Sequence, residues 1–347
     1  MTACKVSIDE GRAISTLTCL VECSHTLNER LEKFWKLKNY DSDTSRALST
    51  NDKKCEQYFE QTVTRTSSGR FVVKLPFRDA DLPIGDNREI ALKRLTHLEN
   101  RLKRDNVMRE RYVEFMRKYI DLGHMSIVKP TLGEYKGAIY LPHHGVLKES
   151  SSSTKLRVVF DASAKDNKGV SLNDALLIGL VLQDNLIDIV IRFRTYKIAL
   201  TADLQKMYRQ VLVHESDRDV QRILWRFSLE DSIKEYRLNT VTYGQACASY
   251  MAVRCLRQLD VEGKERYPLA SHTLLHNTYV DDIISGSSTP ESAQVLQEQL
   301  TSLLREGGFK AHKWCSNSVS SLKGVPFEPN SSFEIDANDT IRALRLE

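Results

Sequence analysis

Apolar residues recur three or four positions apart in several parts of the chain, which predicts amphipathic helices at 27–37, 88–120 and 289–305. The middle segment holds two stripes, and Asp105-Asn106 between them predicts a break, with a stop at Gly123. The stripes are Leu92, Leu95, Leu98 and Leu102, then Met108, Tyr112, Phe115 and Tyr119. For 289–305, Thr289 is the expected N-cap, Pro290 the first turn and Gly307 the stop.

Short apolar and β-branched runs lie between helical segments and predict strands. The expected strands are 69–76, 156–161, 197–203, 222–227 and 233–242, the last two paired, with a hairpin at 274–286. Further helices are expected at 55–62, after Asp203 and at 244–259. Strands mixed with helices in short antiparallel units predict an α+β fold.

Composition narrows the class of protein only a little. Hydrophobic residues make up 41% of 347 positions, enough for a sizeable core, and the net charge of +4 suits polyanion partners or an ordinary soluble enzyme. Seven scattered cysteines predict reduced thiols and an intracellular protein. Cys19, Cys23 and His25 have no fourth ligand for zinc. No apolar run reaches eighteen residues and no signal peptide opens the chain, so we expect no membrane.

The strongest chemical signal is the adjacent pair Asp281-Asp282, which sits inside an apolar, strand-forming run. A surface turn is the alternative, because Asp favours turns. Hairpin turns prefer Asn-Gly or Asp-Gly, however, and adjacent like charges repel unless a cation neutralises them. We therefore expect a divalent metal at the tip of a hairpin.

Asp203 supplies a third carboxylate, at the end of the apolar run 197–203. Oxygen ligands are those that hard divalent cations take. A strand ending in Asp beside a hairpin tipped by Asp-Asp would focus three carboxylates on one point. Two metals held there would activate a hydroxyl and steady a leaving pyrophosphate during phosphoryl transfer.

The order of motifs in the chain resembles that of a reverse transcriptase. Asp203 is followed by Tyr208, then by Thr-Val-Thr-Tyr-Gly at 240–244 and by Tyr-Val-Asp-Asp at 279–282. The flanking stretches are similar to the BEL/Pao class of long-terminal-repeat retrotransposons. They are Phe34-Trp35, 69–76, 140–146, 154–163, 171–174, 206–210, 221–225 and 307–317, so the resemblance covers about residues 30–325.

This resemblance implies a right-hand polymerase in which an antiparallel palm sheet carries helices on one face and is joined to fingers. It divides the chain into a mostly helical lead-in at 1–85, a helical segment at 86–136, fingers and palm at 137–325, and a truncated primer-grip or connection region at 326–347. The thumb is expected to be absent or truncated. At 341–347, Arg345 stands where a Gly would allow the tight turn of a primer grip.

The resemblance also assigns roles to residues. Asp203, Asp281 and Asp282 are the expected catalytic and metal-binding carboxylates, with two Mg²⁺ ions, or Mn²⁺. Lys155 and Arg157 match cations that clasp the incoming triphosphate; a solvated strand edge is the alternative reading. Tyr208 matches an aromatic ring that blocks a ribose 2′-hydroxyl, or else is a buried core residue. Tyr243 and Gly244 match the lining of the nucleotide pocket, where Gln245 departs from the usual small or apolar residue.

Other chemistry-bearing residues have simpler explanations. His143-His144 lack Cys or acidic neighbours and are expected to be a loop feature rather than a metal site. Asp161 and Asp174 are explained by caps and turns as well as by metal binding. Lys313 lies where a Lys near the phosphates is expected. The basic residues of the 88–120 segment are expected to form a solvated face: Lys93, Arg94, Arg101, Lys103 and Arg104.

The expected function is RNA-directed DNA polymerisation by part of a retrotransposon polyprotein. The partners would be an RNA or DNA template with primer and dNTPs, in the cytoplasm within a retroelement particle; the oligomeric state stays open. The alternative is a truncated remnant that binds nucleic acid without polymerising. A metal-dependent nuclease is a third hypothesis, which no further motif supports.

Overall fold

The computed structural model describes residues 49–79, 85–129, 137–147 and 156–322, which belong to one unit beginning at Ser49. Several expectations therefore lie outside the described residues: the helix at 27–37, the group Cys19, Cys23 and His25, Lys155, and the region 341–347. No described helix is long and apolar enough to span a membrane.

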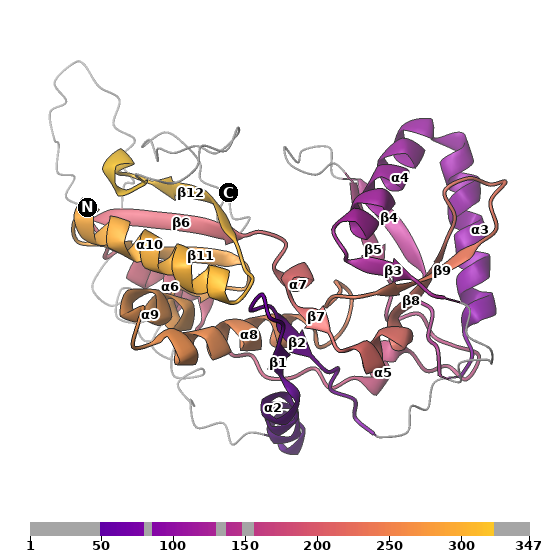
Figure 1. Cartoon of the computed structure of the whole chain (residues 1–347), viewed down its shortest axis with the longest axis horizontal. Coiled ribbons are helices and arrows are strands. Elements are labelled where there is room, and N and C mark those ends of the chain that lie inside the picture. Colours follow the sequence, from indigo (N-terminus) through magenta and orange to yellow (C-terminus); the bar gives the residue numbers. More distant parts are fainter. Residues whose placement is uncertain (1–48, 80–84, 130–136, 148–155, 323–347) are drawn as a thin grey trace, which may run out of the picture. The chain divides into compact units, whose positions relative to one another are not determined.

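The described chain contains both helices and strands, which confirms the predicted α+β fold (Figure 1). The helices are α2 (Thr50–Thr62), α3 (Arg88–Arg104), α4 (Asn106–Asp121), α5 (Leu172–Ala175), α6 (Leu186–Phe193), α7 (Met207–Gln210), α8 (Ala248–Gly263), α9 (Pro268–His276) and α10 (Pro290–Glu306). Two 3₁₀ helices span Glu215–Gln221 and Val319–Leu322.

The strands form four small sheets. One holds β1 (Thr64–Arg65), β2 (Phe71–Val73) and β7 (Leu212–Val213), and another pairs β4 (His143–Leu147) with β5 (Leu156–Phe160). A third has the order β3 (Met125–Ile127), β9 (Lys234–Leu238), β8 (Arg222–Trp225). The fourth, here called the palm sheet, has the order β10 (Thr278–Tyr279), β11 (Asp282–Ser287), β6 (Ile198–Leu204), β12 (Ala311–Ser316), and all its pairs are antiparallel.

The predicted helix break at Asp105 is confirmed. Asp105 ends α3 and caps α4, where its side chain accepts a hydrogen bond from the Met108 backbone N–H at 2.9 Å. Both expected stripes face the core, although Leu92 and Phe115 are only half-buried. The five basic residues expected on the solvated face are all exposed.

Helix α10 also matches its prediction. Thr289 and Ser292 form a reciprocal capping box, Pro290 occupies the first turn, and Gly307 follows the last residue. The buried stripe of α10 packs on β6, β11 and β12, so this helix covers one face of the palm sheet (Figure 1). The strand that carries Asp203 is thereby held between two neighbours and under a helix.

Several predicted boundaries were wrong. The hairpin expected from Leu274 starts only at Thr278, because α9, opened by Pro268, runs to His276 and packs on α8 and α10. A short apolar run cannot by itself distinguish a strand from the end of a buried helix. The helix expected from Gly244 starts at Ala248, since Gly244 has a φ of +97°. Strand β9 ends at Leu238 rather than Thr242.

His143 and His144 lie in strand β4 rather than in a loop, which corrects that expectation. His143 is fully enclosed: its Nδ1 lies 2.6 Å from the Tyr112 hydroxyl and its Nε2 lies 3.0 Å from the Leu224 carbonyl oxygen. Because the carbonyl only accepts, Nε2 carries the proton and Nδ1 accepts from Tyr112. Tyr112 also stacks on Trp225 with ring centroids 5.2 Å apart. His143 is thus a satisfied core residue.

Candidate active site

The carboxylates of Asp203 and Asp282 start from directly opposed backbone positions. In the antiparallel pairing of β6 with β11, Asp282 is the partner of Asp203, and Ile283 is the partner of Ala202. Ala202 and Ile283 are buried, which fixes the register, since a slip of one residue would reverse the faces of every side chain. The two acids therefore meet at the end of the palm sheet because their apolar neighbours align.

Asp281 lies in the two-residue turn between β10 and β11, where Tyr279 pairs with Asp282. Its carbonyl accepts a hydrogen bond from the Leu204 N–H at 2.7 Å, which ties the turn to β6. The other turn residue, Val280, has a φ of +54°. Such a turn favours Gly or Asn, and a β-branched residue there is a strained exception. The structure thus places all three predicted acids, Asp203, Asp281 and Asp282, at one end of the strands of the palm sheet. We call this end the acidic edge.

Asp203 is held by two basic side chains from β12. His312 Nε2 lies 2.9 Å from Asp203 Oδ1, and Lys313 Nζ lies 3.3 Å from Oδ2. Successive residues of a regular strand point to opposite faces, but β12 has a register irregularity between His312 and Cys315, and Lys313 has a φ of +52°. The bulge lets two consecutive side chains reach one carboxylate.

The pKa of Asp203 reflects this clamp. Burial alone would raise the pKa of the carboxyl, but the hydrogen bonds and charges of His312 and Lys313 outweigh burial and lower it. Asp203 is therefore ionised at neutral pH. Sequence spacing gave a hint of Lys313 but none of His312, because a bulge carries no clear signature in the strand pattern.

The donor chemistry of this edge suits hard divalent cations, since all three acids offer carboxylate oxygens. The side-chain arrangement does not complete a site, however: the described residues contain no group of three His, Cys, Asp or Glu side chains placed to hold one metal ion. The expected neighbouring strands are present, but the expected convergence of three carboxylates on one ion is not found. The clamp on Asp203 gives a physical reason, because His312 and Lys313 already hold its two carboxylate oxygens.

Two of the residues predicted to bind the nucleotide lie together beside Asp281. The rings of Tyr208 and Tyr243 meet edge to face with centroids 4.5 Å apart. Burial raises the pKa of Tyr208, a hydrogen bond with Ser249 lowers it, and the charge of Asp281 raises it further. Desolvation raises the pKa of Tyr243 to about 12, where Asp281 again contributes. Since that charge acts on both phenols, the aromatic pair and the acidic edge are neighbours.

Gly244 follows Tyr243 in a conformation that suits glycine. Its φ is +97°, and a Cβ at this position would lie 2.4 Å from the Phe160 carbonyl oxygen. Asn173 fixes the segment by donating to the Gly244 carbonyl at 2.8 Å. The unexpected Gln245 is buried, and its Nε2 donates to Gln221 Oε1 at 2.7 Å. Gln245 is therefore held inside the fold by Gln221.

The remaining predicted residues do not join this group. Arg157 is exposed on β5, and no contact among those described links it to the tyrosines or the acids. Asp174 completes a capping box with Ser171, whose hydroxyl donates to it at 2.8 Å. Asp161 accepts from the Ser163 N–H at 3.1 Å. These two acids are thus engaged in a cap and a turn.

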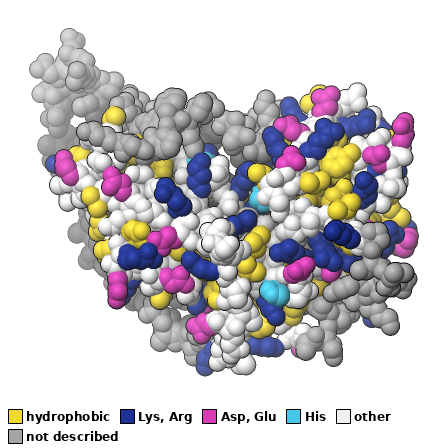
Figure 2. Space-filling model, in the orientation of Figure 1, with side chains coloured by type: hydrophobic (Ala, Val, Ile, Leu, Met, Phe, Trp, Pro, Cys, Tyr) yellow, Lys and Arg dark blue, Asp and Glu magenta, His cyan; other side chains and the backbone are white. Residues whose placement is uncertain are grey.

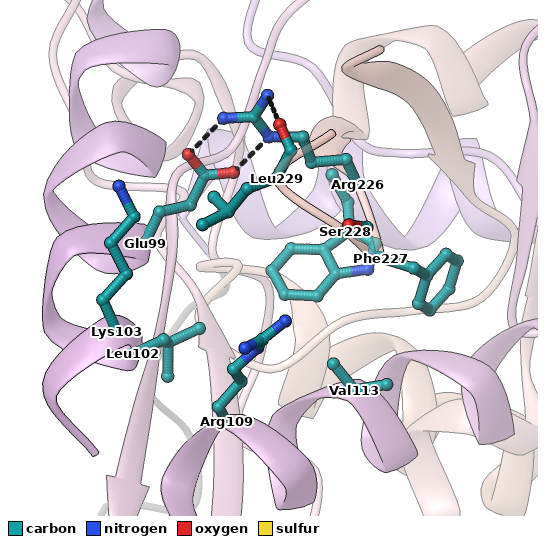
Figure 3. Close-up of a pocket in the computed structure, with 10 residues that line it drawn as sticks. Glu99, Leu102, Lys103, Arg109, Val113, Arg226, Phe227, Ser228 and Leu229 are labelled. Atoms are coloured by element: carbon teal, nitrogen blue, oxygen red, sulfur yellow. Dashed lines mark hydrogen bonds and ion pairs between the residues drawn. The ribbon is translucent and has the colours of Figure 1, made fainter. Parts of the chain in front are cut away.

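A shallow pocket lies elsewhere, among residues of α3, α4 and the end of β8 (Figure 3). Glu99 and Arg226 form a two-point ion pair at its rim, with distances of 2.6 and 2.8 Å. None of the three predicted acids and none of the nucleotide-pocket residues lines it. The pocket is therefore separate from the acidic edge of the palm sheet.

Residues 150–319 match the family model of the reverse transcriptase (RNA-dependent DNA polymerase). This stretch contains the acidic edge, the tyrosine pair and Gly244. This stretch, about half of the chain, is thus similar to a reverse transcriptase domain.

Among solved structures, the chain is similar to the foamy viral protease-reverse transcriptase dRH in complex with double-stranded DNA. The two share 16% sequence identity with a TM-score of 0.40. The match covers 56% of this chain and 28% of the viral chain, so it spans well under half of that protein. A search of curated proteins gives no match.

Proposed function

We propose that this chain is the reverse transcriptase part of the pol polyprotein of a BEL/Pao-type long-terminal-repeat retrotransposon. It would extend the 3′-hydroxyl of a primer with dNTPs on an RNA or DNA template. The observation that carries the proposal is the opposition of Asp203 and Asp282 on β6 and β11, with Asp281 in the adjoining turn, inside the reverse transcriptase domain.

In this proposal, each group of residues at the acidic edge has its own role. Asp203, Asp281 and Asp282 supply the negative charge on which the reacting groups are assembled. Tyr208 and Tyr243, packed edge to face beside Asp281, offer aromatic surface for the sugar and base of a nucleotide. Gly244 allows the backbone to approach closely. Lys155 and Arg157 would reach the triphosphate from the fingers.

Mg²⁺, or Mn²⁺, is the cofactor this proposal implies, with two ions at the three carboxylates. Bound there, the ions would neutralise the charge that develops on the attacking and leaving oxygens. Because His312 and Lys313 now hold Asp203, metal binding would require this clamp to open. We also propose a nucleic-acid partner, and we place the active element's protein in cytoplasmic particles.

Primer extension on poly(rA)/oligo(dT) tests the proposal. Asp281→Asn should reduce extension by about 100-fold or more, the scale on which loss of one transition-state group acts. Its affinity for the primed template should change little, because that binding is electrostatic and involves other residues. Asp174→Asn, which alters an acid in a capping box, is the matched control and should retain extension. Full activity of the Asp281 variant would refute the assignment.

A remnant that binds nucleic acid without polymerising is the second candidate, and the contacts of His312 and Lys313 with Asp203 favour it. In that case the wild-type chain would bind the primed template but extend no primer at any Mg²⁺ or Mn²⁺ concentration. His312→Ala combined with Lys313→Ala would then also stay inactive.

A further inference from the structure

Three basic residues near the tyrosine pair form a group that we call the cation cluster: Arg70, Lys206 and Arg209. Arg70 precedes β2, Lys206 caps α7, and Arg209 lies within α7. Arg70 reaches α7 by donating from Nη2 to the Arg209 carbonyl at 2.9 Å and from Nε to the Gln210 carbonyl at 3.1 Å. Arg70 thereby binds the backbone of α7, the helix that carries the other two basic residues.

The cluster lacks the acidic partners that other arginines of this chain have. No ion pair joins any of its three members to an Asp or Glu of the described chain. By contrast, Arg226 pairs with Glu99 at 2.6 Å and Arg254 with Glu56 at 2.8 Å. Positive charges that a fold gathers and leaves unpaired are suited to an anion from outside.

Arg209 is surrounded by aromatic rings rather than by carboxylates. Its guanidinium carbon lies 4.8 Å from the ring centre of Tyr119, 5.6 Å from that of Phe115 and 5.9 Å from that of Tyr243. Rings hold the guanidinium by cation–π attraction and keep its charge. Its buried Nε has no hydrogen-bond partner among the described residues. The Nε–H donor of the Arg209 guanidinium is thus left without an acceptor in the described chain.

His124 lies beside the same rings and adds a second unsatisfied group. It is 5% exposed, its ring centre is 5.3 Å from that of Tyr119, and neither ring nitrogen has a partner within the described chain. Burial, followed by the charges of Arg209, Lys206 and Arg70, lowers the pKa of His124 to about 4. A neutral imidazole still has one N–H to donate, and leaving such a donor buried and unpaired costs free energy.

We propose that the cation cluster binds a phosphate group of the nucleotide or nucleic acid that the proposed polymerase handles. The inference rests on that proposed function and adds a site to it. Arg209 directly follows Tyr208 and packs over Tyr243, so the phosphate would bind next to the tyrosine pair. The Arg forks and the Lys point charge suit phosphate oxygens. Lys118 nearby does not belong to the cluster, because Glu114 pairs with it at 2.6 Å.

Figure 2 shows that Lys and Arg side chains occupy much of the middle of the face it draws, as a polyanion partner requires. Two sources of phosphate remain: the triphosphate of an incoming dNTP, and the backbone of the primed template. Binding of each probe is measured separately on Lys206→Gln and Arg209→Gln. Sodium tripolyphosphate is titrated by calorimetry without nucleic acid, and labelled oligo(dT) on poly(rA) by fluorescence anisotropy without dNTPs.

Each variant should weaken binding of one probe about tenfold. If the source is the backbone, the slope of log affinity against log salt should also fall by about 1 for Lys206→Gln. Arg101→Gln, which removes an exposed cation from α3, is the control and should change neither probe. Normal affinity of both variants for both probes overturns the site. Lys206 is exposed, so its variant keeps the test open should Arg209→Gln fold poorly.

These measurements separate the site from the proposed function. Both probes report binding without catalysis. If the wild-type chain extends no primer but Lys206→Gln weakens phosphate binding, the phosphate site is supported and the polymerase function is refuted. If the wild-type chain extends primers but both variants bind both probes normally, the polymerase function is supported and the phosphate site is refuted.

Discussion

The acidic edge of the palm sheet and the aromatic core around Tyr112, His143 and Trp225 differ in how their polar groups are bonded. At the acidic edge, the side chains of His312 and Lys313 hold Asp203, and the backbone is strained. The non-glycine residues with positive φ in the described chain are Lys206, Val280 and Lys313, all on segments that carry or contact the acids. Strain of this kind costs about 1–3 kcal/mol per residue and persists where function requires the geometry.

In the aromatic core, by contrast, Tyr112, His143 and Trp225 have regular backbone and closely packed rings. His143 satisfies both nitrogens inside the protein, one with Tyr112 and one with the Leu224 carbonyl. This difference indicates that the polar residues of the aromatic core stabilise the fold, whereas those of the acidic edge are placed for chemistry. Changes in the core should therefore alter unfolding, and changes at the edge should alter chemistry.

Acidification should lower the free energy of unfolding through His143 in the aromatic core. Burial lowers the pKa of His143 to about 4, against roughly 6.5 in an unfolded chain. Between these values the unfolded state binds more protons, so stability is full above pH 6.5 and is lost as pH falls towards 4. From pH 7 to pH 5 this group should remove about 2 kcal/mol of unfolding free energy.

Urea unfolding at pH 7, 6 and 5 measures this loss. His143→Gln is less stable at pH 7 but should show a shallower decline over the same range, since its side chain does not titrate. His124 also has a pKa of about 4, so it accounts for part of the decline in stability that remains in His143→Gln. An equal decline in the wild type and the variant would show that His143 is not the group responsible.

Tyr112→Phe should cost roughly 1.5 kcal/mol, because it leaves the buried Nδ1 of His143 without its donor. Both rings stay packed, so primer extension and dNTP KM should be unchanged if the comparison holds. Chemical denaturation and steady-state kinetics on the same preparation check both halves. A raised KM with unaltered stability would mean that the core and the acidic edge are coupled.

The contrast also explains what could be predicted from the sequence. Helices α3, α4 and α10 follow from stripes and caps, and the placement of Asp203 and Asp282 follows from apolar runs that fix strand register. Such signals are local. The bulge at Lys313 and the αL backbone of Lys206 are set by tertiary packing, so the contact of His312 with Asp203 and the cation cluster could not be predicted from the sequence.

The end of α9 illustrates the same limit. Leu274–His276 carry apolar residues that suit either a strand or a helix, and only their packing on α8 and α10 decides for the helix. Arg157 was assigned by resemblance alone, and its exposed position on β5 leaves its role a prediction.

At the edge, Tyr208→Ala should change sugar selectivity. If the ring lies under the sugar, its removal admits the 2′-hydroxyl and should raise rNTP incorporation relative to dNTP by about tenfold. Tyr208→Phe keeps the ring and should keep the ratio. If Tyr208 only packs against Tyr243, the Ala variant should lose stability and leave the ratio unchanged. The rNTP/dNTP ratio and the melting temperature of both variants distinguish these outcomes.

The smallest expected effect tests the strain itself, at Val280. Replacement by Ala and by Gly both remove the branched side chain, but only Gly tolerates a φ of +54° freely. Ala is ordinarily the more stable of the two by 0.5–1 kcal/mol. Here the order should reverse, with Val280→Gly more stable than Val280→Ala by about 1 kcal/mol. Thermal unfolding of the pair measures this difference. The usual order would mean that the turn relaxes in solution, and then the acidic edge would hold no more strain than the aromatic core.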